Sequence, residues 1–558
     1  MVKWTSKSTL SPFLKLANHT GVHKPVRIIL MITRLRLYIN TIKYLRFRQI
    51  YFRFFYTVFP KLGLIRFKRY SIKDVRLLKP WHNIQANVSA YVSGETLHVD
   101  ILNLELELNL GENIWNTDVY DKLWNYNLNY FEFLETCDKE EGLKLIHHFD
   151  KHIFDLKFGM DPYAVSVRII SWINFMSKWK LQDVRMASSL FSQCLYLKKR
   201  IEYHLLGNHV LENAFALTMG GVTFGHGKLF EKGKGLLIEE LKEQILNDGG
   251  HFELSPMYHQ LILYRILNLI DFLNSNLVIN EDELILFLKS KASKMLGWLQ
   301  TITFKNGDVP NVNDSTEGFA PSSQKLFDYA VVLGLEWHAA TLKECGYRKF
   351  ENSKFEIVID VGQAGPTYQS GHAHADSLNF VLHCRNEPIL IDQGVSSYWD
   401  TLIRSSERST KMHNTIIIND QNSSEVWAEF RLANRANVTV EEEKQTYLRA
   451  THNGYSESFG VVHEREFELG RDEVIIKDHL EIKKNKNIKA EGHLHFHPHC
   501  KPTIKGNRIQ IKDVVLILSQ VDNISVEEYD CSIGFNRRTM ATKVSYQINT
   551  NSKISITC

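Results

Sequence analysis

The stretch KFEIVIDVG (residues 354–362) marks a change in the periodicity of the chain, and this change decides the fold. Its apolar side chains Phe355, Ile357 and Ile359 recur at every second position, which is the spacing of a β-strand. Upstream of it, apolar residues recur three and four positions apart, which is the spacing of an amphipathic α-helix. The sequence therefore predicts a helical domain followed by a β domain.

The helical spacing extends from about residue 117 to residue 345. Successive amphipathic helices joined by short loops form hairpins around a common axis or stack as a solenoid. We therefore expect a helical domain over residues 117–350. The predicted helices are residues 124–135, 161–179, 186–205, 207–224, 228–246, 255–276, 283–302 and 323–335.

The alternating spacing continues to the C-terminus in short segments separated by turn residues, which is typical of an antiparallel sandwich. We expect this β domain over residues 351–558, with a cleft against the helical domain as the natural binding site. Residues 74–116 form a lead-in, in which 87–110 predict a small strand pair. The predicted strand segments of the β domain are residues 354–362, 377–384, 387–394, 414–420, 425–432, 436–443, 446–453, 464–482, 492–499, 508–521 and 543–557.

The composition is that of a soluble globular protein, with 44% hydrophobic and 23% charged residues among 558. A chain of this length exceeds one ordinary core, so two or three domains are expected. The seven cysteines are scattered and form no CxxC pair, which argues against a disulfide framework and against a thiolate zinc site. We expect them to be reduced and structural.

The net charge of +4 originates in an N-terminal arm, residues 1–73, which contains 16 Lys or Arg and no Asp or Glu. Phe, Tyr, Ile and Leu lie between the basic residues. Two interpretations stay open: the arm docks on the acidic body of the protein, or residues 24–69 lie on an anionic membrane surface. No nucleic-acid motif accompanies the charge, so a nucleic-acid partner is not expected.

No apolar run in the arm reaches the roughly 20 residues that a membrane span needs, and no secretory signal with a cleavage site is recognised. The sequence therefore predicts a cytoplasmic or membrane-peripheral protein, with the periplasm as the alternative.

The segment SGHAHADSLNF (residues 370–380) places His372, His374 and Asp376 at every second position, which predicts one face of a strand. Asp392 follows the apolar run PILI, and His413 lies just before the apolar run TIII, so both lie at the ends of buried strands. Two imidazoles and a carboxylate give Zn²⁺ three ligands and leave a fourth position. We choose His374, Asp392 and His413 as this set. The alternative is that these side chains face solvent on a strand edge.

Two helical segments carry further polar groups. GNHVLENAFAL (207–217) places Asn208, His209 and Glu212 on an otherwise apolar helix, where they are hydrogen-bonded to a neighbouring helix or functional. NDGGHFELSPMYHQ (247–260) places Tyr258 in the first turn of a helix that begins with Pro256. A packing tyrosine is the simpler interpretation of that position, and a catalytic one is the alternative.

The segment GHLHFHPHC (492–500) has four histidines at alternate positions, and we rank it below the other groups because no carboxylate or second histidine strand accompanies it.

Taken together, these stretches resemble the heparinase II/III family of polysaccharide lyases. The resemblance covers most of the chain, and it is most specific over residues 365–436, where several motifs follow one another in one order. The segments that carry it are LWNYNLNYFEFL (123–134), DPYAVSVRIISWI (161–173), GNHVLENAFAL, DGGHFELSPMYH, DVPNVNDSTEGFAP (308–321), GPTYQSGHAHADSLNFVL, LIDQGVSSY, RSSERSTKMHNTIII and EVWAEFRLANRA.

The resemblance implies an incomplete (α/α) toroid followed by a large antiparallel β-sandwich, which agrees with the change of period. It also implies β-elimination at a uronic acid of an acidic polysaccharide: a base removes the C5 proton, the C4–O bond breaks, and an unsaturated sugar end remains. The C5 proton is too weakly acidic to be removed unless the adjacent carboxylate is neutralised and the developing enolate is held by hydrogen bonds.

The resemblance also implies roles for the residues found above. Tyr258 is the expected acid and, for some sugar stereochemistries, the base. Asn208 and His209 are expected to neutralise the uronate carboxylate, with His372 facing them from the sandwich. His374, Asp392 and His413 match the zinc ligands of the family, for one structural Zn²⁺ per chain.

Four further residues are expected to support the substrate or the site. Glu212 matches a supporting acidic position, while Glu253 and His259 flank Tyr258 in sequence. Arg408, with the histidines, is expected to lower the pKa of Tyr258 toward a value at which the phenol acts as a base.

The N-terminus departs from the family pattern, because secreted members have a signal peptide where this chain has the basic arm. In this respect the chain resembles a subgroup associated with bacterial surface or exopolysaccharide production.

Two other functions stay open. One is a non-catalytic glycan-binding or assembly protein of a polysaccharide export system. The other is a hydrolase that pairs Glu253 with Asp248 or Asp314.

Overall fold

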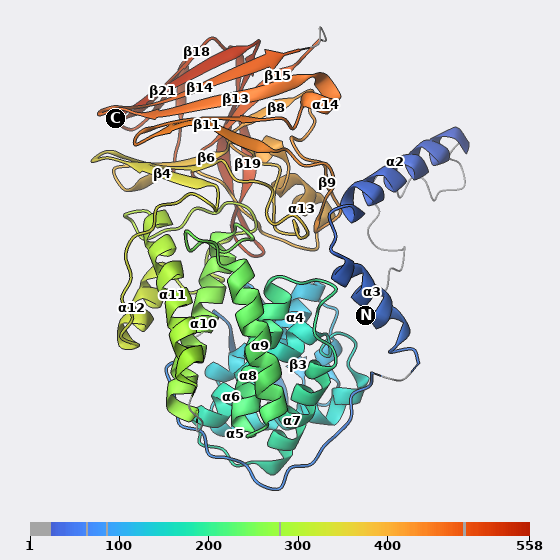
Figure 1. Cartoon of the computed structure of the whole chain (residues 1–558). Helices are drawn as coiled ribbons and strands as arrows, with labels where there is room; N and C mark the ends of the chain where they lie inside the picture. The colour runs from blue at the N-terminus through green and yellow to red at the C-terminus, as the bar shows by residue number, and fades with distance from the viewer. Residues whose placement is uncertain (1–23, 63–64, 85–86, 278–280, 484–486) are drawn as a thin grey trace.

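The computed structural model describes residues 24–62, 65–84, 87–277, 281–483 and 487–558. Helices occupy the first part of the chain and strands the second, as Figure 1 shows. This order confirms the predicted fold class, a multidomain α+β chain with an incomplete (α/α) toroid before a large antiparallel β domain. In the part of the chain that is described, no helix is long and apolar enough to cross a membrane.

The helical domain contains nine α-helices within the described residues, one more than predicted. The additional helix, α5, contains many charged residues and only a narrow apolar stripe, Leu145, Ile146 and Phe149, so its periodicity is weak in the sequence. The helices are α4 (Lys122–Tyr130), α5 (Lys139–His152), α6 (Pro162–Lys178), α7 (Val184–Lys198), α8 (Asn208–Thr223), α9 (Gly227–Gln244), α10 (Pro256–Asn276), α11 (Asp282–Ile302) and α12 (Ser323–Val332).

Two predicted helices are shorter in the structure. The helix predicted over 124–135 is interrupted at Phe131, whose φ of 62° is left-handed, and it continues as a 3₁₀ turn over Glu132–Glu135. The helix predicted to residue 205 ends at Lys198. The chain then turns through Leu206 and Gly207, both with positive φ, before α8 begins.

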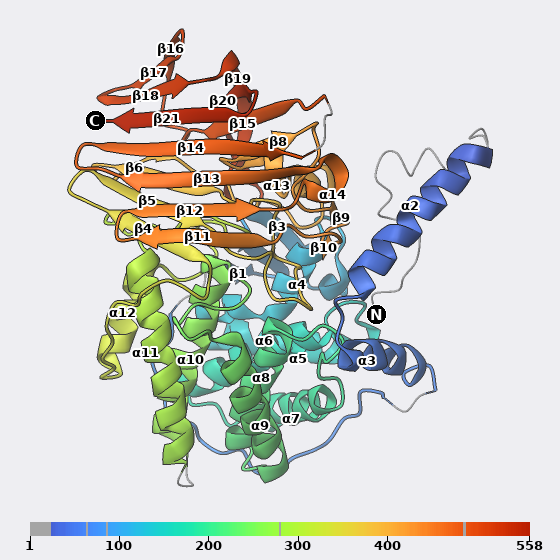
Figure 2. The same ribbon diagram turned by 45° about the horizontal axis from the view of Figure 1, so that its top comes forward.

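Within the described residues the β domain contains one eight-stranded sheet, two four-stranded sheets and one two-stranded sheet, all antiparallel. The large sheet has the order β11-β12-β13-β14-β21-β18-β17-β16, and the four-stranded ones have the orders β19-β20-β15-β8 and β4-β5-β6-β7. Figure 2 shows the large sheet face on. The strands are β4 (Tyr347–Glu351), β5 (Phe355–Asp360), β6 (Phe380–Cys384), β7 (Glu387–Leu390), β8 (Ile416–Ile418), β11 (Val438–Lys444), β12 (Tyr447–His452), β13 (Val461–Leu469), β14 (Glu473–Ile482), β15 (Ala490–His495), β16 (Thr503–Lys505), β17 (Arg508–Ile511), β18 (Val514–Ser519), β19 (Asp522–Gly534), β20 (Arg537–Ile548) and β21 (Asn551–Thr557).

The strand predicted for His372, His374 and Asp376 is wrong. Residues 370–379 form turns and irregular structure, and β6 begins only at Phe380. Leu378 has a φ of 63°, which a continuous strand does not allow. Backbone groups in this segment bond to residues outside any sheet, such as the amide of His374 to the side chain of Asn313. The segment predicted as one strand over 425–432 is likewise a short hairpin, β9 (Val426–Trp427) and β10 (Arg431–Leu432).

The sheet β4–β7 joins the two domains. All six residues of β5 are buried. Ile357 and Ile359 belong to the core of the β domain, whereas Val358, on the opposite face, belongs to the core of the helical domain. Because both faces of this sheet are covered by apolar side chains, the two domains are packed firmly against each other.

The lead-in contains three strands, rather than the predicted pair, which form a meander beside the toroid. They are β1 (Ser89–Ser93), β2 (Thr96–Ile101) and β3 (Leu104–Asn109).

The described part of the arm contains two helices, α2 (Lys24–Ile42) and α3 (Phe47–Val58). Helix α2 projects from the body in both views (Figures 1 and 2). The rest of the arm before Lys24 lies outside the described residues.

Candidate functional site

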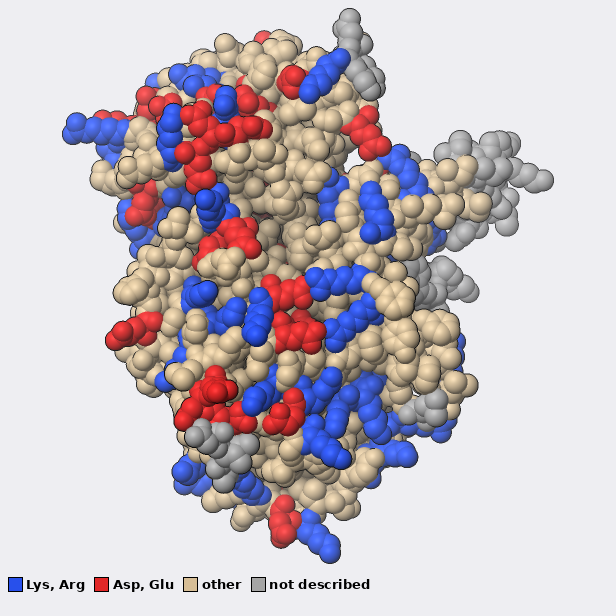
Figure 3. All heavy atoms as spheres, in the orientation of Figure 1, with Lys and Arg blue, Asp and Glu red and all other residues tan. Residues whose placement is uncertain are grey.

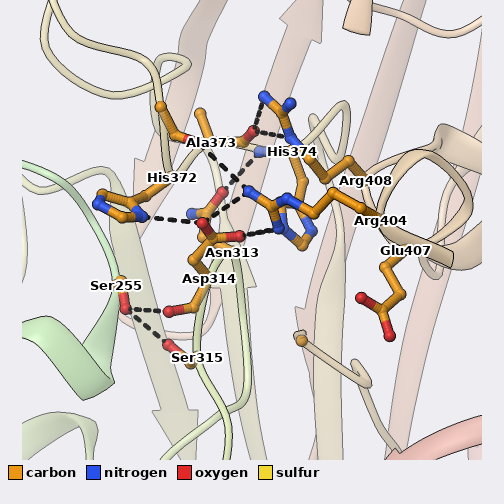
Figure 4. Close-up of polar contacts among 12 residues, drawn as sticks. Ser255, Asn313, Asp314, Ser315, His372, Ala373, His374, Arg404, Glu407 and Arg408 are labelled. Carbon is orange, nitrogen blue, oxygen red and sulfur yellow. Dashed lines mark hydrogen bonds and ion pairs between the residues drawn. The ribbon is translucent and has the colours of Figure 1, made fainter. Parts of the chain in front are cut away.

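Asp314, in the loop before α12, lies at the centre of a polar group where the two domains meet (Figure 4). Its Oδ2 accepts a hydrogen bond from His372 Nδ1 at 2.8 Å, and its Oδ1 pairs with His374 Nε2 at 2.9 Å. Arg404 donates to both oxygens, to Oδ2 at 2.7 Å. Burial alone would raise the pKa of Asp314, but Arg404 and the two histidines hold it well below its ordinary value. One ionised carboxylate therefore orients both histidines of the HxH motif.

His372 faces the helical domain. Its ring lies against that of Tyr258, with 4.1 Å between the ring centroids, and its Nε2 is 3.2 Å from Glu253 Oε2. Ser255 caps α10 through the amide of Tyr258 and also donates to the carbonyl of Asp314, so the loop and the helix start are tied together. The structure therefore brings Tyr258 and His372 into contact, as the resemblance implied.

Asn208 and His209 occupy the first turn of α8 on the other side of Glu253. The amide of Asn208 donates to Glu253 Oε1 at 3.0 Å, and its side-chain Oδ1 is buried with no hydrogen-bond partner. His209 Nδ1 is 3.3 Å from Glu202 Oε1, and 32% of its side chain is exposed. Burial would lower the pKa of His209, but Glu202 raises it above the ordinary histidine value. An amide and an imidazole whose cationic form is favoured by Glu202 thus lie together beside Glu253.

The predicted effect of cations on Tyr258 is wrong in this structure. Burial, followed by the nearby Tyr398, Asp314 and Glu253, raises the pKa of Tyr258 well above its ordinary value. The hydroxyl groups of Tyr258 and Tyr398 are 3.2 Å apart. Arg408 does not approach the phenol. Tyr258 is therefore a neutral proton donor here, which suits the role of an acid.

A second polar group lies behind His374, in the β domain. Asp376, Asp392 and His413 are all buried and offer ligand atoms within 4.8 Å of one another, which suits a metal ion. His374 lies beside them, with 5.3 Å between its ring centroid and that of His413. This group contains two of the three predicted ligands, together with Asp376, which the prediction had not included.

Unpartnered atoms support the fit of this group to a metal. His374 Nδ1, Asp376 Oδ2 and His413 Nε2 are all buried and have no hydrogen-bond partner. Each is an atom that binds Zn²⁺ in proteins, and buried polar atoms without partners are costly. Asp314, which bonds the other nitrogen of His374, matches the carboxylate that orients a ligating histidine.

Three predicted supporting residues do not lie at the group around His372. His259 is buried in the helical domain, where it bonds to the carbonyl of Met295 and lies over Trp298. Arg408 is buried and donates to the carbonyl of Ala373, so it holds the backbone between the two histidines. Glu212 pairs with Arg265 at 2.9 Å, one turn of α8 from Asn208. Of the four, only Glu253 contacts the predicted catalytic residues.

Sequence reasoning missed the roles of Asp314, Arg404 and Tyr398. Asp314 lies in the quoted segment DVPNVNDSTEGFAP and was considered only as a hydrolase carboxylate. Arg404 lies over the rings of Tyr398 and Phe430, at 5.0 and 5.4 Å, and so connects the carboxylate to the aromatic wall of the site. Asp314 lies between two other polar residues, Asn313 and Ser315, so nothing in the local sequence distinguishes it, and its partners follow only from the fold.

The carboxylate pairs expected of a hydrolase are not available. Asp314 is ion-paired with Arg404, and Asp248 accepts hydrogen bonds from the amides of Gly250, Lys343 and Cys345. Both carboxylates serve to hold backbone or side chains in place.

The histidine-rich segment 492–500 forms no metal group among the described residues. His493 bonds to Ser545 and His495 to Asn414, both within the β domain.

A cavity of about 400 Å³ opens on the helical domain near this site. Phe535 lines it and lies 5.4 Å from the ring of Tyr398, while Arg265 links it to Glu212. Its other walls carry the side-chain amides of Asn83, Asn87, Asn103, Asn127, Asn174, Gln260 and Asn311. Amide-lined hollows of this size suit sugar hydroxyl groups.

Two family models match the chain. The heparinase II/III N-terminus model matches residues 166–331, and the heparinase II/III-like C-terminal model matches residues 335–557. No curated protein matches the chain.

Solved structures with a similar fold include a heparan sulfate lyase HepC mutant from Pedobacter heparinus, 18% identical, with a TM-score of 0.56 over 81% of this chain and 79% of that one. A structure of heparinase III is 15% identical, with a TM-score of 0.65 over 80% of this chain and 79% of that one. At these identities the likeness shows the fold.

Proposed function

The chain belongs to the heparinase II/III family of polysaccharide lyases, and from this we propose that it cleaves an acidic, uronate-containing polysaccharide by β-elimination. The observation that supports this most is the contact between Tyr258 of the helical domain and His372 of the β domain, beside Asn208 and His209. In this proposal one charged sugar ring lies between the two domains.

Each residue has one role in the proposed reaction. Asn208 and the cationic His209 bind the uronate carboxylate and hold the negative charge that develops when the C5 proton leaves. His372, oriented through Nδ1 by Asp314, accepts that proton at Nε2. Tyr258 donates its hydroxyl proton to the glycosidic oxygen as the C4–O bond breaks. The elimination consumes no water.

We further propose that Asp376, Asp392 and His413, with His374, hold one Zn²⁺ per chain. When bound, the ion would supply positive charge that fixes the ligands and, through His374 and Asp314, the orientation of His372. These residues lie behind Asp314 as seen from Tyr258, so they serve the site through its structure.

The test is incubation of the protein with a panel of uronate polysaccharides, followed by the ultraviolet absorbance of the new C4–C5 double bond. We expect absorbance with at least one polymer, and none with Tyr258→Phe. Binding of a polymer without a double bond, unaffected by that substitution, would instead favour a glycan-binding or assembly protein.

The arm suggests where the enzyme acts, and we propose that it binds an anionic membrane surface in surface or exopolysaccharide metabolism. Exposed apolar side chains follow one face of α2 at i, i+4, i+8 and i+11, and another face of α3 at i, i+3, i+4 and i+7. They are Met31, Leu35, Ile39 and Ile42 on α2, and Phe47, Ile50, Tyr51 and Phe54 on α3. Basic residues lie among them, and no acid occurs within residues 1–73, so the charge is complementary to anionic lipid.

The membrane proposal is tested by sedimentation with phosphatidylglycerol or phosphatidylcholine vesicles. We expect binding to the anionic vesicles alone, weakened by salt, and lost when Leu35 and Ile39 are both replaced by Gln. A matched control replaces Leu286 and Val331, which are exposed at 65% and 66% on helices remote from the arm, and should bind as the native chain does. Equal binding by both variants would refute the proposal.

A further inference from the structure

Helix α3 of the arm lies outside the residues that the family models match and contacts both domains. Its inner face carries Arg46, Arg48 and Gln49. Arg46 and Arg48 pair with Glu243 and Glu239 on α9, so this part of the arm docks on the acidic body, as one interpretation of the sequence held. Figure 3 shows blue and red side chains meeting where the arm crosses the body.

Gln49 is the buried polar residue at the centre of this contact, with 2% of its surface exposed. Its Oε1 accepts a hydrogen bond from the amide of Arg46 at 2.9 Å, which closes the capping box of α3. Its Nε2 donates to two carbonyls, that of Leu205 at 3.2 Å and that of Tyr368 at 3.4 Å. One amide nitrogen therefore bridges the helical domain and the β domain.

Both carbonyls belong to segments that lead directly into the site. Leu205 is three residues before Asn208, and Tyr368 is four residues before His372. Neither segment is helix or strand, so neither has a regular ladder of hydrogen bonds to hold it. Gln49 supplies a donor to each segment a few residues before Asn208 and His372.

The same two segments meet again at Gly207. A Cβ atom there would lie 2.1 Å from Gln369 Oε1 and 2.6 Å from Glu253 Oε1, and the backbone angles of Gly207, φ 59° and ψ −143°, are ones that glycine adopts without strain. Small shifts between the segments would therefore be felt at Asn208, whose amide bonds to Glu253. Gln49 therefore bonds to the segment that leads to Asn208 and His209 and to the segment that leads to His372.

Arg46 and Arg48, the two arginines next to Gln49 in this contact, differ in the domains that they touch. The guanidinium of Arg46 lies 3.8 Å from the ring centroid of Tyr368, so Arg46 also contacts the β domain. Arg48 lies 4.0 Å from the ring centroid of Tyr203 and contacts the helical domain alone among the partners found for it. Arg48 is therefore a matched control for Gln49 on the same helix.

We propose that Gln49 is a positioning residue that fixes the separation of the two segments that carry the proposed catalytic residues. The kinetic part of this proposal rests on the proposed lyase function. Segments without a regular ladder of hydrogen bonds shift locally even where the domains around them are firmly packed, and a displacement of about 1 Å in a reacting group costs on the order of a hundredfold in rate. An amide that bonds both walls limits such displacement without touching the substrate.

The first test compares Gln49→Met with Arg48→Met by amide hydrogen exchange, which needs no substrate. Gln49→Met should speed exchange in both 203–210 and 365–374, whereas Arg48→Met should affect 203–210 alone. Unchanged exchange at 365–374 in Gln49→Met would overturn the proposal, whether or not the protein is a lyase.

The second test is kinetic, with the cleaved polymer as substrate and circular dichroism to verify that each variant is folded. For Gln49→Met we expect kcat to fall about tenfold or more, with KM within about twofold of the native value. Arg48→Met should retain native kcat. If Gln49→Met had the native kcat and differed only by unfolding at a lower temperature, Gln49 would contribute to stability alone. That result would overturn the proposal.

A third variant supplies a signature that general destabilisation does not. In Gln49→Glu a carboxylate would face two carbonyls with no proton to donate, and its protonation would restore one hydrogen bond. Its kcat relative to the native enzyme should rise as the pH falls from about 8 to about 5, whereas the ratio for Gln49→Met stays constant. A constant ratio for both variants would count against the bridge.

Discussion

The two carboxylate oxygens of Asp314 face two regions of the protein that differ in how far their side chains are exposed to solvent. Oδ2 faces His372, beyond which lie Tyr258 and the partly exposed His209. Oδ1 faces His374, beyond which every member of the proposed metal group is buried. The residues around His372, which we call the open side, can exchange protons with a substrate. The residues around His374, which we call the buried side, serve to keep one another in position.

This difference indicates that the residues of the open side take part in the reaction, and that those of the buried side fix the positions of the reacting groups. Substitutions on the open side should therefore change the rate and leave the stability intact. Substitutions on the buried side should change the stability first. Asp314 belongs to both sides, so its loss should have both effects.

Asp314→Asn is expected to have the largest effect. The asparagine keeps the shape but leaves the buried Arg404 without its counter-charge, which costs about 3–5 kcal/mol of unfolding free energy. Activity should be lost as well, because both histidines lose their orienting carboxylate. Denaturant unfolding and initial rates measure the two effects.

Asp513→Asn is the control for this change. Asp513 pairs with Arg385 at the surface, with 70% of its side chain exposed, so its loss should change stability by less than about 1 kcal/mol. Equal losses in the two variants would mean that the site around Asp314 contributes no more than a surface ion pair.

Tyr258→Phe should separate the two sides most clearly. Removing the proton donor should lower the rate by about 10²- to 10⁴-fold. Stability should change by less than about 1 kcal/mol, because the only hydrogen-bond partner found for the hydroxyl is Tyr398. Tyr398→Phe removes that partner and should cost much less in rate. If the two variants were equally slow, the proton would not come from Tyr258.

The sequence predicted much of the open side because its residues lie in helical segments with a regular period. Tyr258 follows a proline and a serine cap, and Asn208 and His209 follow a glycine, so their places at helix starts are readable. The resemblance then supplied their roles. The local pattern alone favoured a packing side chain for Tyr258, so its expected role came from the family motif.

The buried side was predicted less well because its geometry depends on irregular backbone. Alternation suggested a strand for His372, His374 and Asp376, but the segment turns, and Asp376 reaches Asp392 and His413. Polar residues at every second position occur in a strand and also in a loop that bonds to another loop, so their spacing does not distinguish the two. Asp314 lies 58 residues from His372, so its contact follows from tertiary structure alone.

Removal of the metal should have an intermediate effect on stability. We expect purified protein to contain one zinc per chain. A chelator should lower the unfolding free energy by about 1–3 kcal/mol, because the buried atoms that have no hydrogen-bond partner would lose the ion. His374→Ala should bind less metal, whereas His372→Ala, two residues away, should bind as much as the native chain. Metal analysis and thermal unfolding measure this, and equal loss in the two variants would contradict the division at Asp314.

The pH dependence of His209 should give the smallest effect and the sharpest test of the open side. Glu202 raises the pKa of His209 above its ordinary value, so the imidazolium persists to higher pH than that of an ordinary histidine and is lost as the pH rises through the raised value. Because the cation binds the uronate carboxylate in the proposed reaction, kcat/KM should decline on the alkaline side with a midpoint above about 6.5.

Glu202→Gln removes the carboxylate that raises the pKa of His209, so the alkaline decline should move to lower pH. His209→Gln should be slower at all pH values and should lack this decline altogether. The stability that the His209–Glu202 pair contributes is present below the ordinary pKa of histidine and lost above the raised one, so stability and rate should decline over the same interval. If the alkaline decline of kcat/KM occurred at the same pH in Glu202→Gln, another group would be responsible for it. The proposed role of the His209 imidazolium would then be refuted.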